Sequence, residues 1–102
     1  MQSPSGMLPL IRSKQSEQDL IGIWRHIAAD NPTAATRWLE RIDSRIQSLI
    51  NHPFMGENQP QFGENTRRII EGSYLIFYDV LPDAIHVLRV FHGARKLDEL
   101  FD

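Results

Sequence analysis

Two segments in the first half of the chain repeat apolar residues every three or four positions, which is the pattern of an amphipathic helix. The first follows the capping-box sequence Ser16-Glu17-Gln18-Asp19 and predicts a helix over about residues 16–29. The second starts after Asn31-Pro32, a cap residue followed by a proline suited to the first helical turn, and ends before Pro53. The short connection predicts an antiparallel helix hairpin. The apolar stripes are Leu20, Ile23, Trp24, Ile27 and Ala28 in the first helix, and Ala35, Trp38 or Leu39, Ile42, Ile46 and Leu49 in the second.

The second half of the chain changes to the mixture of β-branched and aromatic residues that is typical of strands. Residues 66–70, 73–80 and 84–91 are predicted strands, and their short connections indicate an antiparallel meander. The last two strands are apolar at alternate and at intervening positions, which indicates a sheet covered on both faces. Residues 7–12 predict one more strand, at an edge of the sheet because Pro9 has no N–H to donate.

These elements follow one another in the order β-α-α-β-β-β, and residues 94–101 add a short C-terminal helix. The order predicts an α+β fold in which an antiparallel sheet of about four strands packs against the N-terminal helix hairpin. Residues 7–102 are expected to form a single domain, and residues 1–6 a disordered leader. Residues 53–65 are predicted to be a loop, because they combine prolines, glycines and polar residues. Three apolar residues are expected to pin this loop to the core: Phe54, Met55 and Phe62.

Composition excludes several classes of protein. Apolar residues make up 41% of the chain and charged residues 24%, as in an average globular domain. No segment approaches the roughly 20 apolar residues of a membrane helix, and no secretory signal is seen, so a cytoplasmic protein without membrane contact is expected. The absence of cysteine excludes disulfides and cysteine zinc sites. A formal net charge of -2 gives no general attraction to phosphate, so this chain alone is expected to bind no specific nucleic acid.

Histidine and arginine are the residues to consider for a charged site. His26, His52, His86 and His92 each lack a second ligand at metal spacing on the same element, so we expect neither a metal nor a cofactor. His86 and His92 have the same parity and should share one face of a strand, about 20 Å apart. Arg89 lies between apolar neighbours in the same strand, so it requires either a carboxylate partner or an exposed binding face.

Three segments, DLIGIWRHIAADNPTAATRWLERI (residues 19–42), GSYLIFYDV (72–80) and VLRVFHGARKLDELF (87–101), resemble the ParE branch of the RelE/ParE superfamily. They follow the family's order and spacing, and the closing HGARKLDELF is the most specific part. The resemblance implies a RelE/ParE-like fold and the toxin of a type II toxin-antitoxin system, as in plasmid stabilisation. It also implies a ParD-like antitoxin, in a heterodimer or heterotetramer, and DNA gyrase as a target that is inhibited by binding.

The alternative function is that of a RelE-like ribosome-dependent endoribonuclease, which cleaves messenger RNA. That reaction needs a base, an acid, and cations that stabilise the charge growing on the phosphate. Arg67, Arg68 and Arg95 are candidates for the cations. However, Leu75 replaces the arginine that follows the tyrosine of the central strand in RelE-type toxins, and Phe101 replaces their terminal tyrosine. We therefore expect no catalytic residue and favour a gyrase poison; a non-toxic relic that only binds its antitoxin is the third hypothesis.

Two sets of residues are expected to bind partners. Apolar residues exceed what so small a core needs, so some of the surplus is expected to stay exposed; it includes Phe54, Met55, Phe62, Phe77, Phe91 and Phe101. A disordered segment of the antitoxin is expected to cover them and to pair its acidic residues with the arginines. The antitoxin-binding set is Trp24, Trp38, Tyr74, Phe91 and Phe101, and the target-binding set is Arg67, Arg68, Arg89, His92, Arg95 and Lys96.

Overall fold

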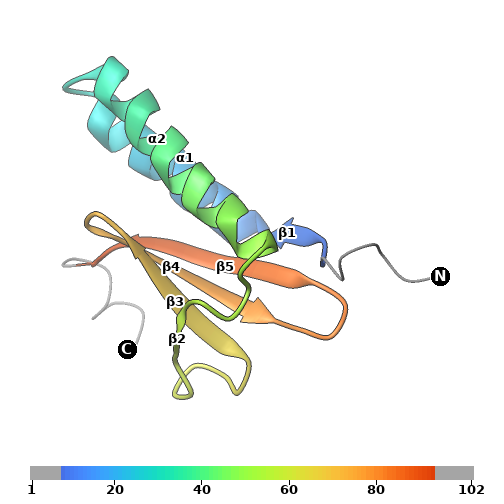
Figure 1. The fold of residues 1–102 in the computed structure, drawn as a ribbon. Coiled ribbons are helices and arrows are strands. Elements are labelled where there is room, and N and C mark those ends of the chain that lie inside the picture. Colours follow the sequence, from blue (N-terminus) through green and yellow to red (C-terminus); the bar gives the residue numbers. More distant parts are fainter. Residues whose placement is uncertain (1–7, 94–102) are drawn as a thin grey trace.

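The computed structural model describes residues 8–93, which form a five-stranded sheet and a helix hairpin. The strand order is β1-β5-β4-β3-β2; β1 runs parallel to β5, and all other neighbours are antiparallel. Figure 1 shows both long helices over one face of the sheet. The elements are β1 (Leu10–Arg12), α1 (Lys14–Ala28), α2 (Pro32–Gln47), the 3₁₀ helix η2 (Ser48–Ile50), β2 (Glu57–Asn58), β3 (Thr66–Glu71), β4 (Tyr74–Val80) and β5 (Ile85–His92).

The predicted α+β class, helix hairpin and meander are confirmed, and two details of the sheet are wrong. The sheet has five strands rather than about four, because β2 forms inside the predicted loop and pairs with β3. It is also not wholly antiparallel, because β1 pairs with β5 in parallel. A strand of two residues is too short to show alternation, so the sequence pattern did not reveal β2. The predicted leader and C-terminal helix lie outside the described residues.

The start of α1 differs from the capping-box prediction. Ser13 is the N-cap: its Oγ accepts a hydrogen bond from the Ser16 N–H at 2.9 Å, and the Ser16 hydroxyl donates to the Ser13 carbonyl at 2.8 Å. The Ser13 hydroxyl also donates to the Leu88 carbonyl at 2.8 Å, and the Ser13 N–H donates to the Val87 carbonyl. The prediction that Ser16 caps α1 is therefore wrong, and the true cap joins the helix to β5.

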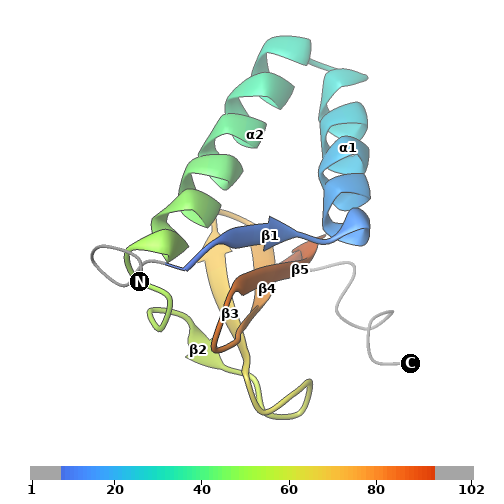
Figure 2. The same cartoon turned by 90° about the vertical axis from the view of Figure 1, so that its right-hand side faces the viewer.

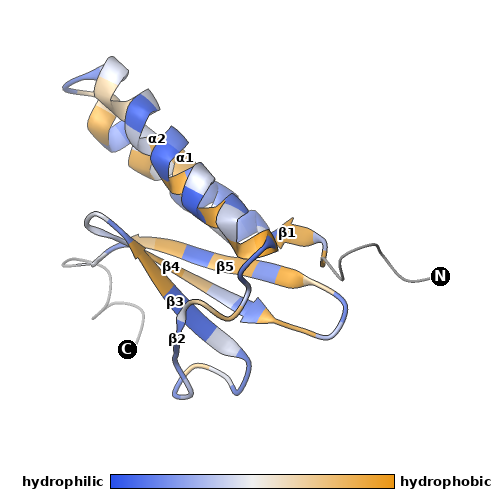
Figure 3. Ribbon diagram, viewed as in Figure 1, coloured by the Kyte–Doolittle hydropathy of each residue, from blue (hydrophilic) through white to orange (hydrophobic). Residues whose placement is uncertain are grey.

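The core between the helices and the sheet follows the predicted apolar stripes. Helix α2 begins at Pro32 behind the Asn31 cap, whose side chain accepts from the Ala34 N–H at 3.0 Å. Trp38 and Leu39 both pack partly buried against this core. Figure 3 shows that β4 and β5 are apolar along most of their length. The buried residues of the helix face are Leu20, Ile42, Ile46, Leu49, Ile69, Tyr74, Ile76, Tyr78, Ile85, Val87 and Val90.

The opposite face of the sheet carries a second, smaller apolar cluster. Leu75, Phe77 and Phe91 form it, and Phe62 from the loop packs edge-on against Phe77 with ring centroids 5.4 Å apart. Phe77 and Phe91 are only 3% and 5% exposed, whereas Phe54 and Met55 are exposed, so the prediction that some of the apolar surplus stays at the surface is confirmed. The prediction of apolar residues on both faces of the sheet is confirmed.

Strand β5 contains one extra residue in its pairing with β4. Tyr78 pairs with Val87, whereas the preceding Phe77 pairs with Arg89, so Leu88 is bulged out of the ladder. A bulge of one residue reverses the facing of all positions beyond it. His86 and His92 therefore lie on opposite faces of the sheet, and the prediction that they share a face is wrong.

The far end of the helix hairpin stands away from the sheet. In Figures 1 and 2 the connection between α1 and α2 lies beyond the sheet in both views. We call this end, residues 22–36, the hairpin tip; Trp24 within it is 37% exposed, and Ile21 in the middle of α1 is 51% exposed. Within residues 8–93, no helix is both long and apolar enough to cross a membrane.

The loop between η2 and β3 is held by a buried hydroxyl group. The Tyr78 hydroxyl donates to the Pro53 carbonyl at 2.8 Å and accepts from the Gly56 N–H at 2.9 Å. A Cβ atom at Gly56 would lie 2.4 Å from this oxygen, so only glycine fits there. Phe54 and Met55 are exposed, so the prediction that they pin the loop is wrong; Phe62 does pack inward.

The variant Tyr78→Phe tests the role of this hydroxyl. It leaves the Gly56 N–H and the Pro53 carbonyl without their buried partner, which is expected to lower the free energy of unfolding by about 1–3 kcal/mol in urea titrations. Burial raises the pKa of Tyr78 above its ordinary value of 10.0, so the folded state retains the proton longer than the unfolded state does. The contribution is therefore full below about pH 10 and is lost as the pH rises towards the folded pKa. Equal losses of stability in wild type and variant above about pH 10 would contradict this assignment.

Candidate functional site

Arg89, one of the predicted target-binding residues, is bound within the molecule. Its Nε and Nη2 atoms donate to the two carboxylate oxygens of Asp19 at 2.9 and 3.0 Å. The hydrogen bonds to Asp19 raise the pKa of Arg89, and partial burial opposes that shift. The guanidinium also lies 4.5 Å from the ring centroid of Phe91. The carboxylate partner that the sequence required for Arg89 is therefore present, on a helix seventy residues earlier in the chain.

Asp19 also closes the exposed edge of β5. Strand β1 pairs with β5 only from Ile85 to Val87, so no strand among residues 8–93 pairs with the rest of that edge. Helix α1 packs there instead, and Asp19 Oδ2 accepts a hydrogen bond from the Val90 N–H at 2.9 Å. One carboxylate thus satisfies a strand N–H and a guanidinium, which fixes the first turns of α1 against the sheet.

Arg67 and Arg68 both hold the loop that precedes β3. Arg67 Nη1 donates to the carbonyls of Phe54 and Gly56 at 3.1 and 2.7 Å, and its guanidinium lies 5.1 Å from the Phe54 ring centroid. Arg68, on the opposite face of β3, forms an ion pair with Glu57 of β2. These two predicted target-binding residues thus make structural contacts that join β3 to the loop.

Three of the predicted residues do come together, at the end of the sheet below α2. The ring of Tyr74 lies edge-on to the rings of Trp38 and His92, with centroids 5.5 Å away in each case. Gly72, in the β3-β4 turn, has a φ of 59°, and a Cβ there would lie 2.5 Å from the Trp38 ring. The Nδ1 atom of His92 is buried, and residues 8–93 give it no hydrogen-bond partner.

The other predicted residues are dispersed. Trp24 lies at the hairpin tip, where its Nε1 donates to the Thr36 hydroxyl at 3.4 Å. Phe91 belongs to the buried cluster on the opposite face of the sheet. Arg95, Lys96 and Phe101 lie outside the described residues. In the part of the chain that is described, no three His, Asp or Glu side chains are grouped to hold a metal ion.

A row of arginines on α2 was missed in the sequence. Arg37, Arg41 and Arg45 recur at every fourth position, which places them on one side of the helix, and we call them the arginine row. The four-residue spacing of these arginines is visible in the sequence, but the prediction for this helix used only its apolar residues. Arg41 lies 4.4 Å from the Trp38 ring centroid and pairs with Glu71 at 2.9 Å.

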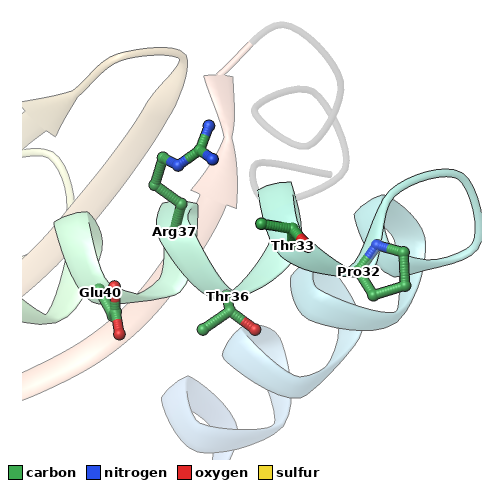
Figure 4. Close-up of a pocket in the computed structure, with 5 residues that line it drawn as sticks. All are labelled: Pro32, Thr33, Thr36, Arg37 and Glu40. Carbon is green, nitrogen blue, oxygen red and sulfur yellow. The ribbon is translucent and has the colours of Figure 1, made fainter.

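Two surface grooves border the arginine row. The first, of about 450 Å³, is lined by Pro32, Thr33, Thr36, Arg37 and Glu40, and Figure 4 shows Arg37 leaving the helix on the side away from Thr36 and Glu40. The second, of about 320 Å³, is lined by Arg41, Ser44, Arg45, Ser48 and Glu71. The Nε atom of Arg45 is buried and has no hydrogen-bond partner among residues 8–93.

Nearly the whole chain matches a known family of toxins. Residues 10–97 match the sequence model of the family described as the ParE toxin of the type II toxin-antitoxin system parDE. The chain belongs to the ParE toxin family. It is therefore the toxin of a type II system, as the quoted segments indicated.

Relatives of this ParE-family toxin carry the names of both branches. Two proteins of Caulobacter vibrioides are similar: Toxin RelE1 is 29% identical over 88% of this chain and 95% of the relative, and Toxin ParE1 is 25% identical over 88% and 94%. A solved chain of the chromosomal ParDE toxin-antitoxin system from P. aeruginosa superposes with a TM-score of 0.73 at 20% identity, covering 84% of this chain and 96% of that one. The last comparison shows a shared fold.

The variant Asp19→Ala tests the contact between α1 and β5. It leaves the Arg89 guanidinium and the Val90 N–H without their partner, and the expected loss in free energy of unfolding is about 2–3 kcal/mol. Urea titration followed by circular dichroism measures this loss. The matched control is Gln18→Ala, an exposed neighbour, which should change stability by less than about 0.5 kcal/mol. An equally small effect of Asp19→Ala would refute the assignment.

Proposed function

We propose that this ParE-family toxin inhibits DNA gyrase by binding to it and that a ParD-like antitoxin neutralises it. The observation that carries the proposal is the engagement of Arg67 and Arg68 in contacts with the loop and with Glu57. A ribonuclease would need these cations on the phosphate of its substrate. Withdrawing them would release the loop, so binding without bond cleavage is the better supported activity.

The position of Leu75 supports the same proposal. Its side chain is buried with Phe77 and Phe91 on the face of the sheet opposite the helices, where a nuclease of the RelE type would need a further cation. An apolar residue in a buried cluster contributes nothing to phosphate charge stabilisation. At this position, too, the chain has no cation that could stabilise the phosphate during RNA cleavage.

Exposed apolar side chains support an antitoxin partner. Ile21 and Trp24 of α1, together with Phe54 and Ile70, remain at the surface. Apolar groups of this size in a small chain favour a partner that covers them. The similar solved structure comes from a ParDE system, and a ParD-like antitoxin is the corresponding partner for this toxin.

The alternative, a RelE-like ribosome-dependent endoribonuclease, is favoured by one observation. Toxin RelE1 of Caulobacter vibrioides is 29% identical over most of the chain. The two functions differ in their targets and in whether a bond is broken, so paired assays separate them.

Purified toxin is expected to reduce supercoiling of relaxed plasmid by gyrase and to trap cleaved DNA, while messenger RNA in a translating extract stays intact. Gel electrophoresis of the plasmid and primer extension on the transcript measure the two effects. Adding the product of the neighbouring antitoxin-like reading frame should restore supercoiling. The variant Arg68→Gln serves as the control for catalysis, because a binding toxin does not need this cation at a phosphate. Cut transcripts, with cutting abolished by Arg68→Gln, together with normal gyrase activity, would refute the proposal and support the endoribonuclease.

A further inference from the structure

The arginine row has more positive charge than its own contacts neutralise. Among the described residues, Arg37 and Arg45 form no ion pair, and Arg41 pairs only with Glu71. By contrast, Arg12, Arg68 and Arg89 each have a carboxylate partner. Two of the three positive charges on this side of α2 thus have no carboxylate partner among residues 8–93.

Helix stability explains only part of the row. A cation in the last turn of a helix is stabilised by the helix dipole, and Arg45 occupies that position in α2. Arg37 lies in the second turn, where the dipole does not favour a cation, and within residues 8–93 it forms no ion pair. The surface pair of Arg41 and Glu71 contributes little, because Arg41 is half exposed and solvent screens it.

The groove at the end of the row is shaped to receive an oxygen ligand. Ser44, an exposed hydroxyl, lies in it between Arg41 and Arg45. Two guanidinium groups, those of Arg41 and Arg45, line the same groove. An incoming carboxylate would therefore gain a charge pair and charge-assisted hydrogen bonds there.

We propose that the arginine row is the docking site for an acidic peptide segment of the antitoxin, a role that rests on the proposed function. Positions four residues apart on a helix are separated by about 6 Å along its axis. A partner helix with acidic residues at the same interval places one carboxylate opposite each arginine.

A synthetic peptide tests the site without the antitoxin. The probe is a helical peptide of about four turns with glutamate at every fourth position, and the control peptide has glutamine there. In spectra of the full-length toxin, the Nε–H signals of Arg37, Arg41 and Arg45 are expected to shift with the glutamate peptide only. The signal of Arg25, an exposed arginine on α1, should not move. Equal shifts with both peptides, no shift, or shifts with a short DNA duplex and not with the peptide would overturn the inference.

Binding of the antitoxin itself gives the second test. The double variant Arg37→Gln/Arg45→Gln is expected to bind it about tenfold more weakly at low salt, since each exposed charge pair contributes a factor of about two to five. High salt should remove most of the difference. Arg37→Gln alone should show a smaller loss, and Arg25→Gln none. Thermal unfolding monitors folding of each variant.

These outcomes separate the two proposals. If the wild-type toxin binds the antitoxin and the double variant binds it equally well at low salt, the docking site is refuted and the proposed function stands. If the glutamate peptide shifts the row while the wild-type toxin binds no antitoxin, the acidic docking site stands and the proposed partner is refuted.

Discussion

The arrangement of this fold depends on one carboxylate at an incomplete sheet edge. Strand β1 is only three residues long, so the second half of β5 has no strand beside it on this edge in the described part of the chain. An exposed strand edge invites pairing with other chains. Here α1 covers it, with the Ser13 cap hydrogen-bonded to β5 and Asp19 bonded to Val90 and Arg89. A helix thus protects the edge that a longer strand would otherwise occupy, and the orientation of the whole hairpin follows from this contact.

The other arginines of the sheet are also engaged in contacts within the fold. Arg67 and Arg68 bind a loop that has little regular structure of its own, and the Tyr78 hydroxyl holds it from below. The polar groups of these sheet residues are therefore bound within the protein. Arg37 and Arg45 of α2, by contrast, have no carboxylate partner among residues 8–93. Structure and recognition are in this way assigned to different elements.

Much of the fold was predictable because periodicity records burial directly. Ala35, Ile42 and Ile46 were placed inward by spacing alone, and all are fully buried. The bulge at Leu88 was not predictable, because one extra apolar residue fits either face of the strand pattern. The need of Arg89 for a carboxylate followed from its apolar neighbours, whereas the choice of Asp19 required the tertiary structure. Residues proposed for binding were scattered because residue type does not reveal which arginines the fold already uses.

The two tryptophans lie in different parts of the helix hairpin, so the fluorescence of each reports on a different region of the molecule. Trp38 lies over Gly72 and against Tyr74, so its emission responds when α2 moves relative to the sheet. Trp24 is partly exposed and donates to Thr36 of α2, so its emission responds to whatever covers that end of the hairpin. Fluorescence of single-tryptophan forms can thus distinguish a partner that seats on the tip from one that loosens the body of the fold.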